Sequence, residues 1–183
     1  MSPEQREEQT TELGAKVARL AGAMLKLEPG ALARLRRMDV EGPGEPDFWR
    51  LATELDLPTH PAGLRLVRIM ALLAPKGDPG NRAPLHRFER PLGTVLCEAG
   101  LSEARLARFL ALPFERRGPA LESMARFINA ARAQSGGVNC HDIACLLFST
   151  EAMHARRLAG SYYRCLDRAA RQQDTDEKKE PAA

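Results

Sequence analysis

The chain has 183 residues, of which 44% are hydrophobic and 28% charged, a composition typical of a globular protein that buries its own core. No apolar run approaches the roughly 18 residues that a membrane span needs, and the polar, acidic N-terminus does not resemble a secretory signal. We therefore expect a cytoplasmic protein that does not bind membranes and keeps its four cysteines as reduced thiols.

Helical periodicity runs through most of the chain. Apolar residues recur at intervals of three and four, and breakers such as Gly118–Pro119 separate the periodic stretches. The expected helices cover residues 10–27, 31–38, 46–55, 62–74, 91–99, 102–112, 119–134, 140–148 and 150–172. Because no stretch alternates for long as a strand would, the sequence predicts an all-α protein, a compact bundle of about eight or nine helices.

Irregular and polar segments divide the chain into regions. The longest irregular stretch, residues 74–91, contains four prolines and two glycines and is net basic, which predicts an exposed, mobile loop. We expect an acidic N-terminal extension at residues 1–12 and a disordered tail at 174–183. Between them, a helical domain at 13–173 is expected to divide into two lobes near the loop.

The positive charge of the chain is almost all arginine, at 22 of 27 basic residues. A guanidinium group stays charged and can bind phosphate through two hydrogen bonds. The formal net charge is only +3, but without residues 1–12 and 174–183 the rest has 24 basic and 16 acidic residues, a net charge of +8. We expect such a body to attract polyanions in a salt-dependent manner.

Helical geometry predicts that many of these arginines lie together on outward-facing sides of helices. In the helices expected at 31–38, 102–112 and 150–172, apolar side chains gather on one side and arginines on another. The candidate binding residues from this geometry are Arg34, Arg36, Arg37, Arg105, Arg108, Arg157, Arg164 and Arg168, with Arg171 on the same face as the last three. The alternative is that these arginines pair with acidic residues of a neighbouring helix or subunit.

Aromatic residues make up only 5% of the chain, which limits the kind of recognition. Proteins that bind single strands through their bases usually expose aromatic side chains for stacking. The aromatic residues that lie in apolar patterns typical of a core are Phe48, Trp49, Phe109, Phe127 and Phe148. We therefore expect contacts to nucleic-acid backbones, and of the adjacent Tyr162 and Tyr163 we expect one in the core.

No arrangement of residues predicts catalysis, a metal site or a cofactor. Zinc sites use paired ligands at defined spacings, which Cys140, His141 and Cys145 do not match, and His154 lies further along the chain. The four histidines are scattered, and no glycine-rich phosphate loop or dinucleotide motif is present. We expect a non-enzymatic protein with cysteines in its core.

A series of segments follows an order found in a known family. They are GALARLRRM at 30–38, FWRL at 48–51, PLGTVLCEAGLSEARLARFLAL at 91–112, a long helix around Arg126, VN at 138–139 and ARRLAGSYY at 155–163. Together they resemble the CasB family, the small subunit of the type I-E CRISPR surveillance complex, Cascade. The resemblance extends from about Leu13 to Arg171, and the long loop and the acidic ends depart from it.

This resemblance implies a non-catalytic, two-lobed helical protein of antiviral defence, present as two copies in contact beside the other Cascade subunits. It implies binding to the guide RNA (crRNA) and to the target or displaced DNA strand, where backbone contacts stabilise the R-loop and guide pairing supplies specificity. The residues that match basic positions of the family are Arg34, Arg36, Arg37, Arg105, Arg108 and Arg126.

Two other functions are weighed against this one. The first is a helical adaptor whose arginines dock onto acidic protein partners. The second is a helix-turn-helix regulator, which is disfavoured because no second helix presents a clear base-reading face after a short glycine turn.

Overall fold

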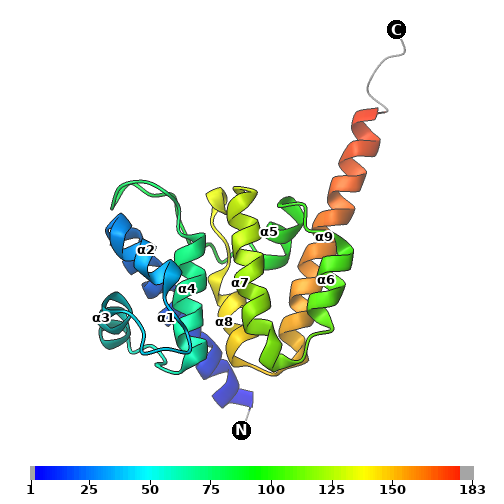
Figure 1. Ribbon diagram of the computed structural model, residues 1–183. Helices are drawn as coiled ribbons and strands as arrows, with labels where there is room; N and C mark the ends of the chain where they lie inside the picture. The colour runs from blue at the N-terminus through cyan, green and yellow to red at the C-terminus, as the bar shows by residue number, and fades with distance from the viewer. Residues whose placement is uncertain (1–2, 178–183) are drawn as a thin grey trace.

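The computed structural model describes residues 3–177, which form nine α-helices and one short 3₁₀ helix (Figure 1). They are α1 (Pro3–Lys26), α2 (Pro29–Arg37), α3 (Pro46–Leu55), α4 (Pro61–Leu73), α5 (Leu92–Glu98), α6 (Glu103–Leu110), α7 (Phe114–Ala130), η1 (Ala133–Gly136), α8 (Cys140–Phe148) and α9 (Ala152–Glu177). The described residues contain no strand, only an isolated bridge between His86 and Val138. The predicted all-α bundle of eight or nine helices is confirmed.

Prolines start several of these helices. Pro29, Pro46 and Pro61 each occupy the first position of a helix. The ring of proline fixes φ near the helical value, and its missing N–H is not needed in the first turn. Residues that interrupt the helical pattern in the sequence therefore also define where the next helix begins.

One expected break lies inside a helix. α7 runs continuously from Phe114 through Gly118 and Pro119, although the proline lies beyond the first turn and removes one backbone hydrogen bond of the helix. Gly118 also serves packing, since a Cβ at this position would lie 2.7 Å from Cδ of Arg65. Gly118 thus contributes to the contact between α7 and α4, and the Gly118–Pro119 pair does not end a helix.

The two ends of the helical domain also differ from the prediction. α1 begins at Pro3, so most of the expected acidic extension is the first part of a helix. α9 continues to Glu177 because no glycine or proline occurs between Gly160 and Pro181, and residues 174–177 of the expected disordered tail are therefore helical. Residues 178–183 of that tail lie outside the described residues.

A continuous hydrophobic core receives side chains from all nine helices of the described chain. α4 lies at its centre, with α2 on one side and α7 and α8 on the other (Figure 1). Within α4, only Pro61, Ala62, Arg65 and Arg68 are not buried. The division into two lobes near residues 74–91 stays a prediction, and side chains on both sides of this loop share the same core.

α9 packs closely on α5 because Gly93 has no side chain. A Cβ at Gly93 would lie 2.2 Å from the carbonyl oxygen of Leu158, so only glycine allows this approach. The hydroxyl of Tyr162 donates a hydrogen bond to the carbonyl oxygen of Leu101 and holds the middle of α9 in place. Beyond this contact the helix leaves the body, and residues 167–172 are all exposed (Figure 1).

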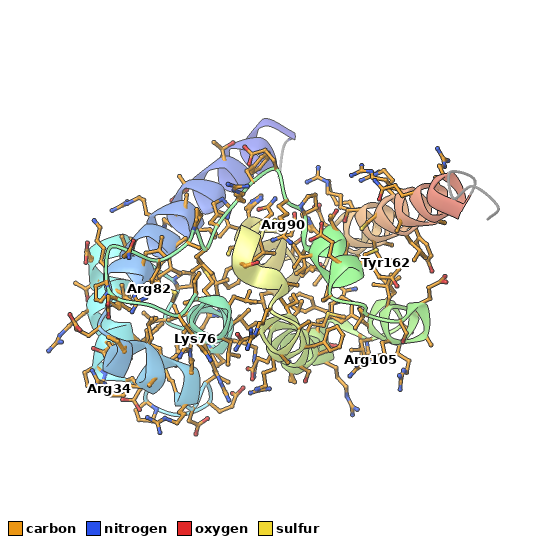
Figure 2. All side chains as sticks on the ribbon, turned by 90° about the horizontal axis from the view of Figure 1, so that it is seen from above. Arg34, Lys76, Arg82, Arg90, Arg105 and Tyr162 are labelled. Carbon is orange, nitrogen blue, oxygen red and sulfur yellow. The ribbon has the colours of Figure 1, made fainter. Side chains whose placement is uncertain are left out.

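The loop between α4 and α5 is exposed along most of its length, as predicted, but it is also fastened to the body. Nη1 of Arg82 donates hydrogen bonds to carbonyl groups at the end of α1. The acceptors are the carbonyl oxygens of Met24 (3.2 Å), Leu25 (3.0 Å) and Leu27 (2.7 Å). Figure 2 shows Arg82 beside α1. With Leu85 buried in the core, the loop caps one end of the bundle.

Helices that could cross a bilayer are not found among residues 3–177, since none is both long enough and apolar enough.

Candidate nucleic-acid interface

Arg34 and Arg37 of α2 lie in different environments. Nε of Arg34 donates to Oδ2 of Asp47 on α3 at 2.7 Å, and this carboxylate is buried. Arg34 is therefore paired within the fold, which is the alternative that the sequence left open. Arg37 is exposed, and within the described chain the one hydrogen bond of its guanidinium runs from Nε to the carbonyl oxygen of Ala33, 3.2 Å away on the same helix.

Arg36 does not face outward, which corrects the prediction. Its Nε donates to the carbonyl oxygen of Ala71 at 2.8 Å and its Nη2 to that of Ala74 at 3.4 Å, so the guanidinium caps the end of α4. The reason is that α2 packs on α4, and Arg36 lies next to the apolar arc of α2, from which its long side chain reaches these carbonyls. Burial lowers the pKa of Arg36, and the nearby charge of Arg82 lowers it further.

Arg105 and Arg108 are exposed on α6, as predicted. The guanidinium carbon of Arg105 lies 5.0 Å from the centre of the Phe127 ring, a cation–π contact that holds it against α7. Among the described residues, the one hydrogen-bond partner of the Arg108 guanidinium is the carbonyl oxygen of Ala104, 3.4 Å from its Nε. Both guanidinium groups can bind an anion, because neither forms an ion pair with a described carboxylate.

Arg126 belongs to a charge cluster that the sequence did not reveal. Glu122 is 6% exposed, and its carboxylate faces Arg65 and Arg68 of α4 as well as Arg126 of α7. Its oxygens lie 2.9 Å from Nε of Arg65, 3.5 Å from Nη1 of Arg68 and 3.5 Å from Nη2 of Arg126. We call these four residues the Glu122 cluster. The side chain of Arg126 stays 49% exposed, so it is only partly occupied by this pairing.

α9 carries the most open basic face. Arg157, Arg164 and Arg168 are exposed, and none of them forms an ion pair with a carboxylate in the described part of the chain. Leu158 and Tyr162, which the helical wheel places on the opposite side, are buried. The geometry predicted for α9 is therefore confirmed, while its binding role stays a prediction.

Two-thirds of the predicted arginines thus remain exposed without an ion pair to a described carboxylate. These unpaired arginines are Arg37, Arg105, Arg108, Arg157, Arg164 and Arg168. α9 lies close to the start of α6, since the hydroxyl of Tyr162 donates to the carbonyl oxygen of Leu101, two residues before α6. α2 lies on the far side of the bundle (Figure 1), and Figure 2 likewise places Arg34 and Arg105 at opposite sides. The unpaired arginines therefore lie on three helices, α2, α6 and α9.

The aromatic side chains are less uniformly buried than predicted. Phe48 and Phe109 lie in the core, whereas Phe127 and Phe148 are half-buried. Trp49 was predicted to lie in the core, but it is 44% exposed. Its Nε1 donates a hydrogen bond to the carbonyl oxygen of Pro43 at 2.9 Å, which keeps the ring at the surface.

The remaining aromatic residues comprise one confirmed prediction and one omission. Tyr162 is buried and Tyr163 is 40% exposed, as expected for neighbours on a helix. Phe88 is 68% exposed, and sequence reasoning missed it. The signal was present, since Phe88 lies close to Arg87 and Arg90 in a loop bounded by prolines.

Cysteines and histidines meet in α8. Sγ of Cys145 lies 3.4 Å from Nε2 of His141, and both residues are buried. Burial raises the pKa of Cys145 to about 11, so this thiol is protonated at neutral pH. Cys140 is also buried, which confirms two of the cysteines as core thiols, while Cys97 and Cys165 are half-buried. Among the described residues, no three or more His, Cys, Asp or Glu side chains are grouped so that they could hold a metal ion.

Comparison with known proteins gives no match: no family model fits the chain, and no curated protein and no solved structure matches it. The resemblance to CasB proteins therefore stays a prediction that rests on the sequence motifs.

Proposed function

We propose that this protein binds nucleic-acid backbones without sequence preference, as the small subunit of a type I-E CRISPR surveillance complex. The order of the CasB-like motifs supports the assignment to the complex. The unpaired arginines support the binding activity, and the observation that carries it is the exposed face of Arg157, Arg164 and Arg168 on α9.

The spacing on α9 suits a phosphate backbone. At about 100° and 1.5 Å per residue, Arg157, Arg164 and Arg168 fall within about 40° of one another and extend over about 16 Å of the helix. Exposed guanidinium groups lose little hydration when they exchange water for phosphate oxygens. A charged helix face of this kind binds strands through their backbones and not through their bases.

Such contacts have a clear role in R-loop formation. Exchanging a DNA duplex for an RNA–DNA duplex of the same length is nearly balanced in free energy, so modest contacts to a backbone shift the equilibrium. A subunit without catalytic groups can act in this way. In the assembled complex, the strand bound along α9 is the target or the displaced DNA strand.

The test compares two triple variants of equal charge. Arg157→Ala, Arg164→Ala and Arg168→Ala together remove the face of α9. The control replaces Arg19, Arg50 and Arg116, three exposed arginines elsewhere on the surface, with alanine. Fluorescence anisotropy with a labelled single strand of about 20 nucleotides is measured from about 50 to 200 mM salt.

We expect the α9 variant to reduce the slope of log affinity against log salt by about 2, since each lost phosphate contact on a single strand removes about 0.7. The control should change the slope by less than half of that. Equal losses in the two variants would mean diffuse attraction without a defined site. A wild-type protein that binds no nucleic acid would refute the proposal and favour the adaptor function.

The assignment to the complex is tested separately. A tagged chain expressed in its own host should co-purify with short RNAs that carry CRISPR repeat sequence, and the α9 variant should shorten the lifetime of the R-loop formed by that complex. An unchanged R-loop lifetime in the complex with the α9 variant would mean that the arginines of α9 do not contact the R-loop.

A further inference from the structure

Phe88 lies at the tip of a hydrogen-bonded turn in the loop between α4 and α5. Its side chain is 68% exposed, more than any other large hydrophobic side chain among the described residues. The N–H of Arg90 donates to the carbonyl oxygen of Arg87 at 3.2 Å, which closes the turn over Phe88 and Glu89. Because burial is what stabilises an apolar side chain, this ring contributes little to the fold from its position.

The base of this turn is fixed on both sides. The N–H of Arg87 donates to the carbonyl oxygen of Val138 at 3.0 Å, and the N–H of Asn139 donates to that of Arg90 at 2.8 Å. Nη1 of Arg90 donates to the carbonyl oxygen of Gly137 at 2.6 Å, and Figure 2 shows Arg90 beside η1. A ligand that covers the ring therefore does not have to order the segment that carries it.

The arginines of this loop divide into structural and available ones. Arg82 is occupied by the carbonyl groups at the end of α1, and Arg90 by Gly137. Arg87 is exposed, and within the described chain its guanidinium has no hydrogen-bond or ion-pair partner. An exposed aromatic ring and an available cation are therefore neighbours at the tip of a fixed turn.

We propose that Phe88 stacks on an unpaired base of a single-stranded nucleic acid while Arg87 binds an adjacent phosphate. The inference rests on the proposed function and adds a base contact to the backbone contacts of α9. A ring beside a positive charge matches a base attached to a phosphate, and stacking of this kind tolerates any base. Bases inside a duplex are already stacked and do not offer a free face.

A protein partner fits this turn less well. Protein interfaces bury a central apolar anchor within a wider patch of contacts that excludes water. The other residues of the turn are Arg87, Glu89 and Arg90, so the turn supplies no second apolar side chain beside the ring.

The experiment uses the full-length protein and two labelled probes, an oligo-deoxythymidine of about 20 nucleotides and a duplex of equal length. Phe88→Ala is expected to weaken single-strand binding about tenfold and duplex binding less than about twofold. Phe88→Tyr should bind as the wild type does, whereas Phe88→Leu, which is apolar but not aromatic, should bind as Phe88→Ala does. Trp49→Leu replaces another exposed aromatic side chain, on α3, and should leave both affinities unchanged.

Two further measurements separate stacking from charge. Phe88→Ala should leave the salt slope unchanged because no cation is lost, while Arg87→Ala should reduce it by about 0.7. In a Trp49→Phe background, Phe88→Trp provides a single tryptophan, whose fluorescence should be quenched when the strand binds.

The stacking proposal is overturned if Phe88→Leu binds the single strand as tightly as the wild type, or if Phe88→Ala weakens duplex and single strand equally. It is also overturned if Phe88→Ala leaves single-strand binding intact, and loss of binding to a protein subunit in that variant would then assign the ring to a protein interface. Wild-type protein that binds neither probe refutes the proposed function itself. Circular dichroism confirms that each variant is folded.

Discussion

Replacing Glu122 with glutamine is expected to destabilise the fold by removing one charge and little else. Glutamine keeps the volume and one acceptor oxygen, so Nε of Arg65 retains an acceptor at the 2.9 Å contact. The negative charge that faces three guanidinium groups disappears. The side chains of Arg65 and Arg68 are only 16% and 21% exposed, so water cannot fully compensate their charges.

The size of the stability loss in Glu122→Gln follows from how deeply the arginine partners of Glu122 are buried. Removing one member of a fully buried ion pair costs about 3–5 kcal/mol, whereas exposed pairs contribute at most about 1 kcal/mol. The Glu122 cluster lies between these limits, because Arg126 is half exposed and Arg65 keeps Glu41 at 3.2 Å. We expect a loss of about 2–3 kcal/mol, which for a chain of this length lowers Tm by about 5–10 °C.

Urea unfolding followed by circular dichroism measures this loss. Arg126→Ala is the matched control, since it removes only the half-exposed partner and should cost less than about 1 kcal/mol. Raising the salt to about 1 M should not remove the difference between the two variants, because buried pairs are screened weakly. Two results would refute this prediction. The first is a loss of unfolding free energy in Glu122→Gln no larger than that in Arg126→Ala, and the second is an equal loss in the two variants at high salt.

Three further predictions follow from individual contacts. Arg36→Ala should lower the free energy of unfolding by about 1–2 kcal/mol, because two carbonyl groups at the end of α4 lose their donor. The adjacent Arg37→Ala should lower it by less than about 0.5 kcal/mol, and urea unfolding compares the two variants. Cys145 is buried, and burial raises its pKa to about 11, so iodoacetamide at about pH 8 should modify it far more slowly in the folded protein than in urea, as followed by mass spectrometry; equal rates would contradict the assigned burial. Burial also lowers the pKa of His86, so the unfolded state takes up a proton first and stability should fall as the pH drops below about 6.5 until the folded-state pKa is passed. His86→Asn should flatten this fall in unfolding curves at successive pH values, and an unchanged pH dependence would assign it to other groups.

Most of the fold could be predicted from the sequence because helix periodicity and its breakers are local signals. Residues 46–55 and 140–148 form α3 and α8 with the expected bounds. The break expected at Gly118–Pro119 was wrong because a local rule cannot see that Arg65 of a distant helix fills the space above Gly118. Packing between helices decided that position.

The candidate site could be predicted only in part, since a helical wheel gives the direction of a side chain but not its partner. The wheel placed Arg164 and Arg168 correctly at the surface. It could not show that Arg34 meets Asp47, or that Arg36 reaches the end of α4 from the border of the apolar arc. Phe88 was missed for another reason: a loop has no helical periodicity, so only the neighbouring Arg87 and Arg90 indicated that its ring is exposed.

Arginine therefore has two roles in this chain, since some arginines stabilise the fold and others are exposed and available to a ligand. This distinction decides how binding data are interpreted. Arg36 and Arg82 bind backbone carbonyl groups at helix ends, and Arg65 binds a buried carboxylate. Replacing any of these would reduce polyanion binding by destabilising the fold, even if the residue never contacts a ligand. Loss of binding identifies a contact only when the free energy of unfolding is unchanged, a condition that we expect exposed, unpaired residues such as Arg164 and Arg168 to meet.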